Sequence, residues 1–207
     1  LSHAERAGAA FRPGTTVRAF SSGEGVRIEA EGGFVAEADF AICADGAHSP
    51  VGRMAGLGAD IAECAAWEVE VKAPPAALRR YRSRSLIDLG YNPWGYAWLF
   101  PKANVLSFGI VLPPDQAGQM KERVRAYTSR LGLGDAEVDI ARGHKIRFRR
   151  GSESIAAGRA LLAGDSAGLA DEFTEEGIAY AVQSGRLAAR NVLRALVLGR
   201  RVDEPLA

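Results

Sequence analysis

Residues 161–189, LLAGDSAGLADEFTEEGIAYAVQSGRLAA, decide the fold of this chain. Residues 159–163 predict an apolar strand, and residues 166–173 predict a loop. A helix is expected from about residue 174 to residue 198, with Thr174 as its N-cap. Its apolar stripe is expected at positions that step by four and three: Ile178, Val182, Gly185, Ala189, Val192 and Leu196. The order strand, loop and long helix is typical of an α/β domain.

The same stretch favours a ligand that carries hydroxyl and phosphate groups. Gly164 and Asp165 end the strand, and the Asp165 carboxylate could accept hydrogen bonds from sugar hydroxyls. Backbone N–H groups near Gly177 and Ile178 could face an anion or a polarised carbonyl at a helix N-terminus. The alternative is that the small residues only allow tight packing between strand and helix.

A second motif lies earlier in the chain. The apolar run at 40–44 predicts a strand buried on both faces, as in a parallel sheet. The sequence ADGAHSPV follows at 44–51. Asp45 offers an acceptor for ribose or for water bound to phosphate, and Gly46 lets the backbone approach a ligand closely. The alternative is a plain Asp-Gly turn.

Between the two motifs, the pattern changes to that of a sheet. Alternating residues predict strands at 66–71, 85–90, 96–101, 105–112 and 144–150, and one helix at 115–131. The expected fold class is α/β with mixed α+β character: a partial Rossmann-like domain with an inserted mixed or antiparallel sheet. The predicted division is 1–60 for the first part of that domain, 61–157 for the inserted sheet, and 158–207 for the second part with the long helix.

Composition excludes several functions. The 207 residues carry 26 Lys and Arg against 25 Asp and Glu, so bulk charge does not favour nucleic-acid binding. No apolar run approaches the roughly 18–20 residues that span a bilayer. The two cysteines, Cys43 and Cys64, form neither a disulfide framework nor a zinc site, and no metal is expected. A reducing, cytoplasmic setting is the default expectation.

Both ends of the sequence look abrupt. Residues 1–10, LSHAERAGAA, resemble the tail of a helix that began earlier, and residues 203–207 follow the long helix without a cap. The chain is therefore expected to be a piece of a larger protein.

Three motifs together resemble a known family. Ala44-Asp45-Gly46 with Ser49 resembles the second fingerprint of FAD-dependent enzymes of the aromatic hydroxylase type, and residues 161–189 resemble the third. Between them, residues 95–102, GYAWLFPK, resemble the Y-x-W-x-F-P signature of geranylgeranyl reductases, which use reduced FAD to saturate prenyl double bonds. The resemblance runs from about residue 7 to residue 198.

The resemblance implies roles for individual residues. Asp165, after Gly164, matches the aspartate that binds the ribityl chain of FAD, and Gly177 and Ile178 match backbone positions beside the N1–C2=O edge of the flavin ring. Asp45 and Gly46 match the motif beside the pyrophosphate. The substrate cavity wall is matched by Tyr96, Trp98, Phe100 and Pro101. The implied partners are an apolar isoprenoid substrate, an NAD(P)H or ferredoxin-type electron donor, and a membrane surface contacted peripherally.

The sequence also departs from the family pattern. Similar proteins carry Pro at the position of Glu172 and Gly at that of Glu175, so both carboxylates could disfavour an anionic flavin unless they turn to solvent. The G-x-G-x-x-G turn that binds the FAD pyrophosphate is absent, and a missing N-terminal segment of the same protein is expected to supply it, so that the isolated chain would be inactive. No residue is identified as a general acid or base.

Three functions stay open on the sequence alone. The first is an FAD-dependent reductase of prenyl double bonds. The second is an aromatic hydroxylase or halogenase on the same fold. The third is a non-catalytic lipid-binding remnant, which the two departures at 172 and 175 and the missing pyrophosphate site favour.

Overall fold

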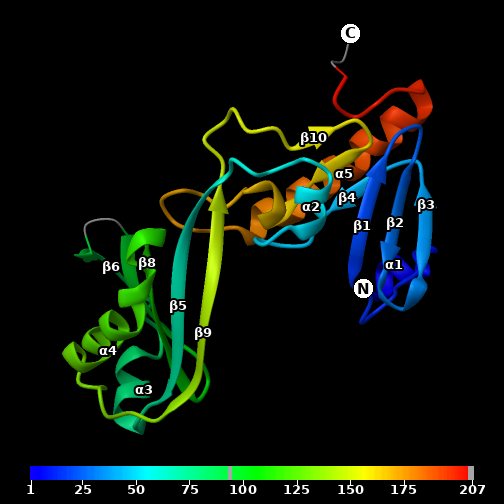
Figure 1. Cartoon of the computed structure of the whole chain (residues 1–207). Helices are drawn as coiled ribbons and strands as arrows, with labels where there is room; N and C mark the ends of the chain where they lie inside the picture. The colour runs from blue at the N-terminus through cyan, green and yellow to red at the C-terminus, as the bar shows by residue number, and fades with distance from the viewer. Residues whose placement is uncertain (93–94, 205–207) are drawn as a thin grey trace.

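The computed structural model describes residues 1–92 and 95–204, and the elements within these ranges form two unequal parts (Figure 1). The smaller sheets and the long helix α5 (Ile178–Leu198) make up one part, and a five-stranded sheet with its helices makes up the other. The predicted α/β class with an inserted sheet is confirmed. Residues 93–94 and 205–207 lie outside the described ranges, so the last three residues of the predicted segment 158–207 are not described.

An antiparallel sheet opens the chain after the short helix α1 (Ser2–Arg6). Its strands are β1 (Val17–Ser22), β2 (Val26–Ala30) and β3 (Val35–Ala38), in the order β1-β2-β3. The turn η1 (Glu31–Gly33) joins the last two strands, and Gly32 and Gly33 both take positive φ there. Two adjacent positive φ angles are what the Gly-Gly pair permits without strain.

The two sequence motifs end neighbouring parallel strands. β4 (Ala41–Cys43) pairs in parallel with β11 (Ala160–Leu162), and β10 (Ala156–Ala157) completes this sheet in the order β10-β11-β4. The parallel pairing was expected, but burial of β4 on both faces was wrong: Cys43 is buried, whereas the Ile42 side chain is 40% exposed. β4 is an edge strand here, and only the Cys43 face packs against the cluster around Leu57 and Leu162.

The inserted sheet is wholly antiparallel between the described strands, in the order β6-β7-β8-β5-β9. Its strands are β5 (Ala62–Lys72), β6 (Leu86–Asn92), β7 (Gly95–Pro101), β8 (Val105–Leu112) and β9 (Val138–Phe148). One face is covered by α4 (Met120–Arg130), which follows the 3₁₀ turn η2 (Pro114–Gln119). The main core lies between this helix and the sheet: Leu106, Phe108, Ile110 and Leu112, which alternate along β8, are fully buried beneath Met120, Val124 and Tyr127.

A second helix in this sheet domain, α3 (Pro75–Tyr81), corrects the prediction of one helix. Seven residues are too few for a periodic apolar pattern to emerge. The start signal is instead a proline: Pro75 stands at N1, where its fixed φ suits a helix and its missing N–H costs nothing.

The long helix α5 begins at Ile178, four residues later than predicted, so Thr174 is not its N-cap. The Asp171 carboxylate holds the preceding segment as a turn, because its Oδ1 accepts hydrogen bonds from the backbone N–H groups of Phe173 and Thr174 and from the Thr174 hydroxyl. Residue Glu175 then takes a left-handed φ of 59°, which a helix cannot contain.

The buried stripe of α5 also differs from the predicted one. Ala188 and Ala195 are buried, whereas the side chains of Ile178 and Val182 are 82% and 54% exposed. The helix approaches the small parallel sheet through small residues: a Cβ on Gly164 would lie 3.4 Å from the Ala181 Cβ. Close backbone approach needs small side chains, and the large ones are therefore placed on the outer side of the helix.

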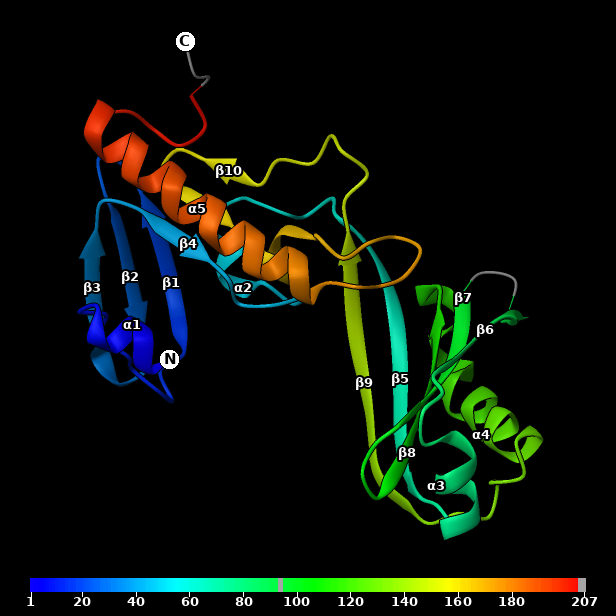
Figure 2. The same cartoon turned by 180° about the vertical axis from the view of Figure 1, so that it is seen from behind.

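Two long neighbouring strands, β5 and β9, connect the two parts of the molecule (Figure 2). Arg147 of β9 is buried and donates hydrogen bonds to the carbonyl oxygens of Ser166 (3.0 Å) and Gly58. The Arg149 N–H bonds to the Gly168 carbonyl at 2.7 Å. The loop that follows β11 is thereby fastened to the end of β9. No helix within the described residues is both long and apolar enough to cross a membrane.

Candidate functional site

The two motifs meet at the carboxyl ends of β4 and β11, where open α/β sheets bind ligands. The Ser166 hydroxyl donates to Asp45 Oδ1 (3.1 Å) and to the Gly46 carbonyl (3.2 Å), which joins one motif to the other. Asp45 also accepts from the Ser49 hydroxyl and, at 2.7 Å, from the Val51 N–H in the first turn of α2 (Pro50–Met54). The Asp45 carboxylate thus organises this corner of the fold; its contact with a cofactor stays a prediction.

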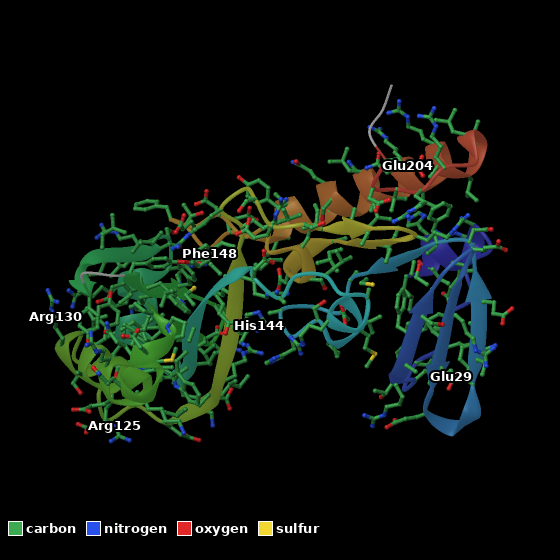
Figure 3. All side chains as sticks on the ribbon, turned by 45° about the horizontal axis from the view of Figure 1, so that its top comes forward. Glu29, Arg125, Arg130, His144, Phe148 and Glu204 are labelled. Carbon is green, nitrogen blue, oxygen red and sulfur yellow. The ribbon has the colours of Figure 1, made fainter. Side chains whose placement is uncertain are left out.

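A pocket of about 460 Å³ lies beside the start of α5. Asp165, in the turn η3 (Gly164–Ala167), and Gly177 both line it, and a Cβ on Gly177 would lie 3.5 Å from Asp165 Oδ1. Ile178 lines it as well. His144 of β9 closes one side, with its Nε2 3.7 Å from Asp165 Oδ2; Figure 3 shows His144 part-way along β9 and Phe148 nearer the end of that strand.

The segment between Asp171 and Gly177 is a loop that reaches past β9 toward β7 (Figure 2). Besides the side-chain bonds of Asp171, its backbone N–H bonds to the Glu176 carbonyl and its carbonyl accepts from the Glu175 N–H, both at 2.9 Å. The hydrogen bonds from Thr174 and Phe173 hold the pKa of Asp171 below its usual value. The Tyr96 hydroxyl of β7 donates to the Thr174 carbonyl at 2.7 Å, so the loop is anchored to the inserted sheet.

Glu175 is the loop residue that turns into this site. The buried Cys64 thiol of β5 donates to Glu175 Oε2 at 3.4 Å, and Glu175 lines the same pocket as Asp165. Burial, with the charges of Asp171 and Glu172, raises the pKa of Glu175 to about 7. Burial and the nearby Glu175 charge raise the pKa of Tyr96 to about 12.

Glu172 behaves differently from Glu175. Its Oε1 lies 3.2 Å from Arg150 Nη2, and its side chain is largely exposed. The two residues that depart from the family pattern, Glu172 and Glu175, therefore differ in their surroundings. One carboxylate faces solvent and pairs with an arginine, and the other is held where its neutral form is favoured.

Aromatic side chains continue from the pocket along the face of the inserted sheet that α4 does not cover. Tyr96, Trp98 and Phe100 alternate along β7, with ring centroids 6.1 Å apart at each step, and Trp98 stacks on Phe100 at 24°. Their strand neighbours Ala97 and Leu99 point into the core on the opposite face. Tyr96 and Trp98 pack against a smaller buried cluster on this face, formed by Cys64, Ala66, Val111 and Phe148, and Phe100 is exposed. The three rings are therefore a partly exposed wall outside the main core of the sheet. Pro101, at the end of β7, pairs with Leu106.

Charged groups close the far end of this aromatic face. Lys102 and Arg142 both bond to Glu70, and Arg142 Nε also lies 3.1 Å from Glu68 Oε2. The Ser107 hydroxyl donates to Glu68 at 2.7 Å. Each cation here has an acidic partner, so the cluster does not resemble a site for a phosphate head group.

The structure gathers some predicted site residues and separates others. Asp165, Gly177 and Ile178 share one pocket, and Tyr96 is linked to it through the loop. Asp45 and Gly46 lie at the neighbouring strand end. Trp98, Phe100 and Pro101 lie farther away, along β7.

Sequence reasoning did not select His144 or Cys64, since neither belongs to a motif. Glu175 was noted only as a departure. Among the described residues, no group of three or more His, Cys, Asp or Glu side chains is arranged to hold a metal ion.

Comparisons with known proteins agree with the motifs. No protein-family model matches the chain. Geranylgeranyl diphosphate reductase of Oryza sativa subsp. japonica is 30% identical over 174 residues, which cover 81% of this chain and 36% of the rice protein. Digeranylgeranylglycerophospholipid reductase of Methanothrix thermoacetophila is 29% identical over 192 residues, covering 88% of this chain and 48% of that protein. The chain thus spans less than half of either relative.

Solved structures show the same fold. A geranylgeranyl bacteriochlorophyll reductase-like protein from Thermoplasma acidophilum superimposes with a TM-score of 0.80 at 23% identity, over 96% of this chain and 53% of the other. The flavin-dependent brominase Bmp2 superimposes with a TM-score of 0.72 at 17% identity, over 99% of this chain and 55% of the other. The predicted resemblance to geranylgeranyl reductases is confirmed in sequence, and the fold is that of flavoproteins.

Proposed function

We propose that this chain, as a relative of geranylgeranyl reductases, is part of an FAD-dependent oxidoreductase that saturates prenyl double bonds of an isoprenoid or isoprenoid lipid. The observation that carries the proposal is the continuity between two surfaces. The pocket at Asp165 and Gly177 leads, through Glu175 and Tyr96, onto the aromatic face of β7. A prenyl chain offers only CH groups and π density, which flat apolar side chains bind well.

The residues at the pocket fit FAD. The Asp165 side chain is 38% exposed, which leaves its carboxylate able to accept hydrogen bonds from ribityl hydroxyls. Gly177 has no side chain to fill the space beside Asp165, and Gly177 and Ile178 begin a 21-residue helix whose N-terminus favours a negatively charged ring edge. Asp45, Gly46 and Gly164 border the pyrophosphate side in this proposal. Reduced FAD would supply the hydride for alkene reduction.

In this proposal, the chain divides into a cofactor-binding part and a substrate-binding part. We assign 1–60 and 158–207 to cofactor binding and 61–157 to substrate binding, with Trp98, Phe100 and Pro101 as the wall. The electron donor is proposed to be NAD(P)H or a ferredoxin-type protein. A lipid substrate further implies a peripheral contact with a membrane from the cytoplasmic side.

The relatives favour reduction over the alternative chemistries. The rice and Methanothrix thermoacetophila relatives, which match in sequence, are named as reductases, whereas the brominase resembles the chain in fold at 17% identity. A lipid-binding remnant was favoured by Glu172 and Glu175. That argument is weakened because Glu172 pairs with Arg150 and burial favours the neutral form of Glu175.

An anaerobic turnover experiment tests the proposal. The full-length protein, which includes the segment expected to bind the FAD pyrophosphate, is loaded with FAD, reduced with dithionite and mixed with geranylgeranyl diphosphate, and the return of the oxidised flavin spectrum is followed together with the product mass. Flavin oxidation with a product heavier by two hydrogens for each reduced double bond is expected. Flavin that stays reduced, with the prenyl chain unchanged, would overturn the proposal.

A further inference from the structure

Glu175 occupies the junction between the proposed cofactor pocket and the proposed substrate wall. It lines the pocket with Asp165 and Gly177, and its carboxylate also contacts Cys64 of the inserted sheet. The preceding residue, Thr174, accepts the hydrogen bond from Tyr96, the first ring of the aromatic face. The other carboxyl group that lines this pocket, Asp165, approaches the sheet through His144 of β9, whose Nε2 lies 3.7 Å from Asp165 Oδ2.

The backbone holds Glu175 in a conformation that its side chain disfavours. Its φ of 59° lies in the left-handed region, where glycine is the unstrained choice. The hydrogen bond from the Glu175 N–H to the Asp171 carbonyl keeps that conformation in place. Strained non-glycine residues cluster at functional sites, because the surrounding structure must maintain them for a use.

The groups that face Glu175 set its protonation. Cys64 and Tyr96 face it from the sheet, Asp171 and Glu172 lie on its own loop, and His144 and Asp165 share its pocket. Desolvation is the largest influence on its pKa and raises it, the two loop acids raise it further, and the bond from the Cys64 thiol lowers it. With a pKa of about 7, the carboxyl can both hold and release a proton near neutral pH, as a general acid must.

We propose that the Glu175 carboxyl is the proton donor in alkene reduction, an inference that rests on the proposed function. Hydride from reduced FAD forms one C–H bond, and the π electron pair of the alkene takes the Glu175 proton to form the other. The flavin is left oxidised by two electrons, the alkene is reduced by two, and the carboxylate regains its proton from solvent. Cys64 is a positioning residue, because its thiol fixes Oε2 and leaves Oε1 to carry the proton.

Single-turnover kinetics test this role. Full-length, FAD-loaded wild type, Glu175→Gln and the control Glu172→Gln are reduced anaerobically and mixed with geranylgeranyl diphosphate across a pH series. Glu175→Gln is expected to reduce the alkene at least about a hundredfold more slowly with unchanged FAD and substrate affinity. The wild-type rate should fall as pH rises past the Glu175 pKa of about 7, and the residual Glu175→Gln rate should not follow that titration.

A second variant guards against a folding defect. Glu175→Gly accepts the left-handed φ without strain and restores the residue that similar proteins carry, so it should fold and bind FAD, and its rate should no longer follow the titration seen in wild type. Glu172→Gln removes a neighbouring carboxylate that pairs with Arg150 at the surface, so it should keep the wild-type rate at low pH, with its pH profile moved slightly downward because one of the two loop acids that raise the Glu175 pKa is gone.

Infrared spectroscopy of the protein without FAD gives a readout independent of turnover. A protonated-carboxyl band should titrate near pH 7 in the wild type and vanish in Glu175→Gln. In Cys64→Ala the midpoint should move upward, because the thiol hydrogen bond that stabilises the carboxylate is lost.

The outcomes separate the two proposals. If wild type does not reduce the prenyl substrate, the proposed function fails. If wild type reduces it and both Glu175 variants react at the wild-type rate with the wild-type pH profile, the proposed function stands and the proton-donor role is overturned. Loss of rate in Glu175→Gln and loss of the wild-type pH profile in both Glu175 variants, with FAD retained and the carboxyl band absent, support the role.

Discussion

The indole ring of Trp98 lies directly over Gly109, its partner across β7 and β8. A Cβ built on Gly109 would come within 1.9 Å of the Trp98 Cζ2 atom. Glycine in the middle of a strand usually weakens the strand. Gly109 is explained by the Trp98 ring, because any larger residue would collide with it. The flat surface formed by Trp98 and Phe100 thus depends on the absence of a side chain at Gly109.

Gly109→Ala should therefore displace the Trp98 ring. Forcing a methyl group beneath a packed ring costs about 1–3 kcal/mol, so we expect a lower melting temperature and an altered tryptophan signal in near-ultraviolet circular dichroism. The control is Gly118→Ala, where a Cβ would meet nothing within 4 Å and neither signal should change. An unaltered spectrum in Gly109→Ala would show that the ring does not lie over this residue.

Trp98→Ala should remove substrate contacts while the cofactor pocket stays intact. Trp98 is half-buried, packs at the edge of the cluster formed by Cys64, Ala66, Val111 and Phe148, and does not line the pocket at Asp165 and Gly177. The full-length variant should keep its FAD and lose less than about 3 kcal/mol of stability, while turnover of long prenyl substrates falls. A loss of about 3–5 kcal/mol in stability, as for a core tryptophan, together with loss of FAD would instead make Trp98 a packing residue.

In the full-length protein, Asp165→Ala should weaken FAD binding. A charge-assisted hydrogen bond contributes roughly 1.5–3 kcal/mol, and about 1.4 kcal/mol is tenfold in affinity, so we expect a loss of about ten- to a hundredfold in titrations followed by flavin fluorescence. Circular dichroism should stay the same. The exposed Asp135 provides the matched control, Asp135→Ala, with wild-type affinity. Equal FAD affinity in both variants would assign Asp165 to a structural turn.

Arg147→Met should destabilise the protein through the loop that carries Asp165. The buried guanidinium donates to the carbonyl oxygens of Ser166 and Gly58, and each hydrogen bond from a charged group is worth about 1.5–3 kcal/mol. Chemical denaturation should show a loss of at least about 2 kcal/mol. Lys145→Met, which removes the neighbouring surface pair with Glu63, should lose less than about 1 kcal/mol. Equal losses would contradict the clamping role of Arg147.

Glu175→Gln should stabilise the folded chain in a pH-dependent way. The pKa of Glu175 is raised from 4.5 to about 7 on folding. Below pH 4.5 both states hold the proton; between the two values only the folded state holds it, so wild-type stability falls as pH rises, and above about 7 the penalty is constant. The melting temperature of Glu175→Gln should exceed that of wild type by a gap that opens over this range. A gap that does not vary with pH would contradict the raised pKa.

Sequence patterns predicted the sheets better than the loops. The alternation of Leu106, Phe108, Ile110 and Leu112 identified β8 and its buried face, because a strand repeats every two residues whatever surrounds it. The start of α5 was predicted wrongly. The Thr174 hydroxyl bonds to Asp171 in a turn instead of capping the helix. A threonine can make either kind of bond, so residue type alone does not predict which one forms.

The candidate site shows a similar division. Asp165 and Gly177 were identified because their motif is local in sequence. The contact between Cys64 and Glu175 joins residues 111 positions apart, and only the register of β5 against β9, together with the fixed loop, brings them together. No spacing rule connects such residues, so the proposed proton donor could be seen only as a departure from a family pattern.

The inserted sheet enters and leaves through adjacent strands, since Ala62 of β5 is paired with Phe148 of β9. Its two ends are therefore neighbours. A segment with neighbouring ends can be exchanged as a cassette while the rest of the fold keeps its structure. In evolutionary terms, one redox framework can acquire new substrates by replacing this cassette. The residues at the two crossing points, and not those on the aromatic face, are then the ones that natural recombination or a designed chimera has to preserve.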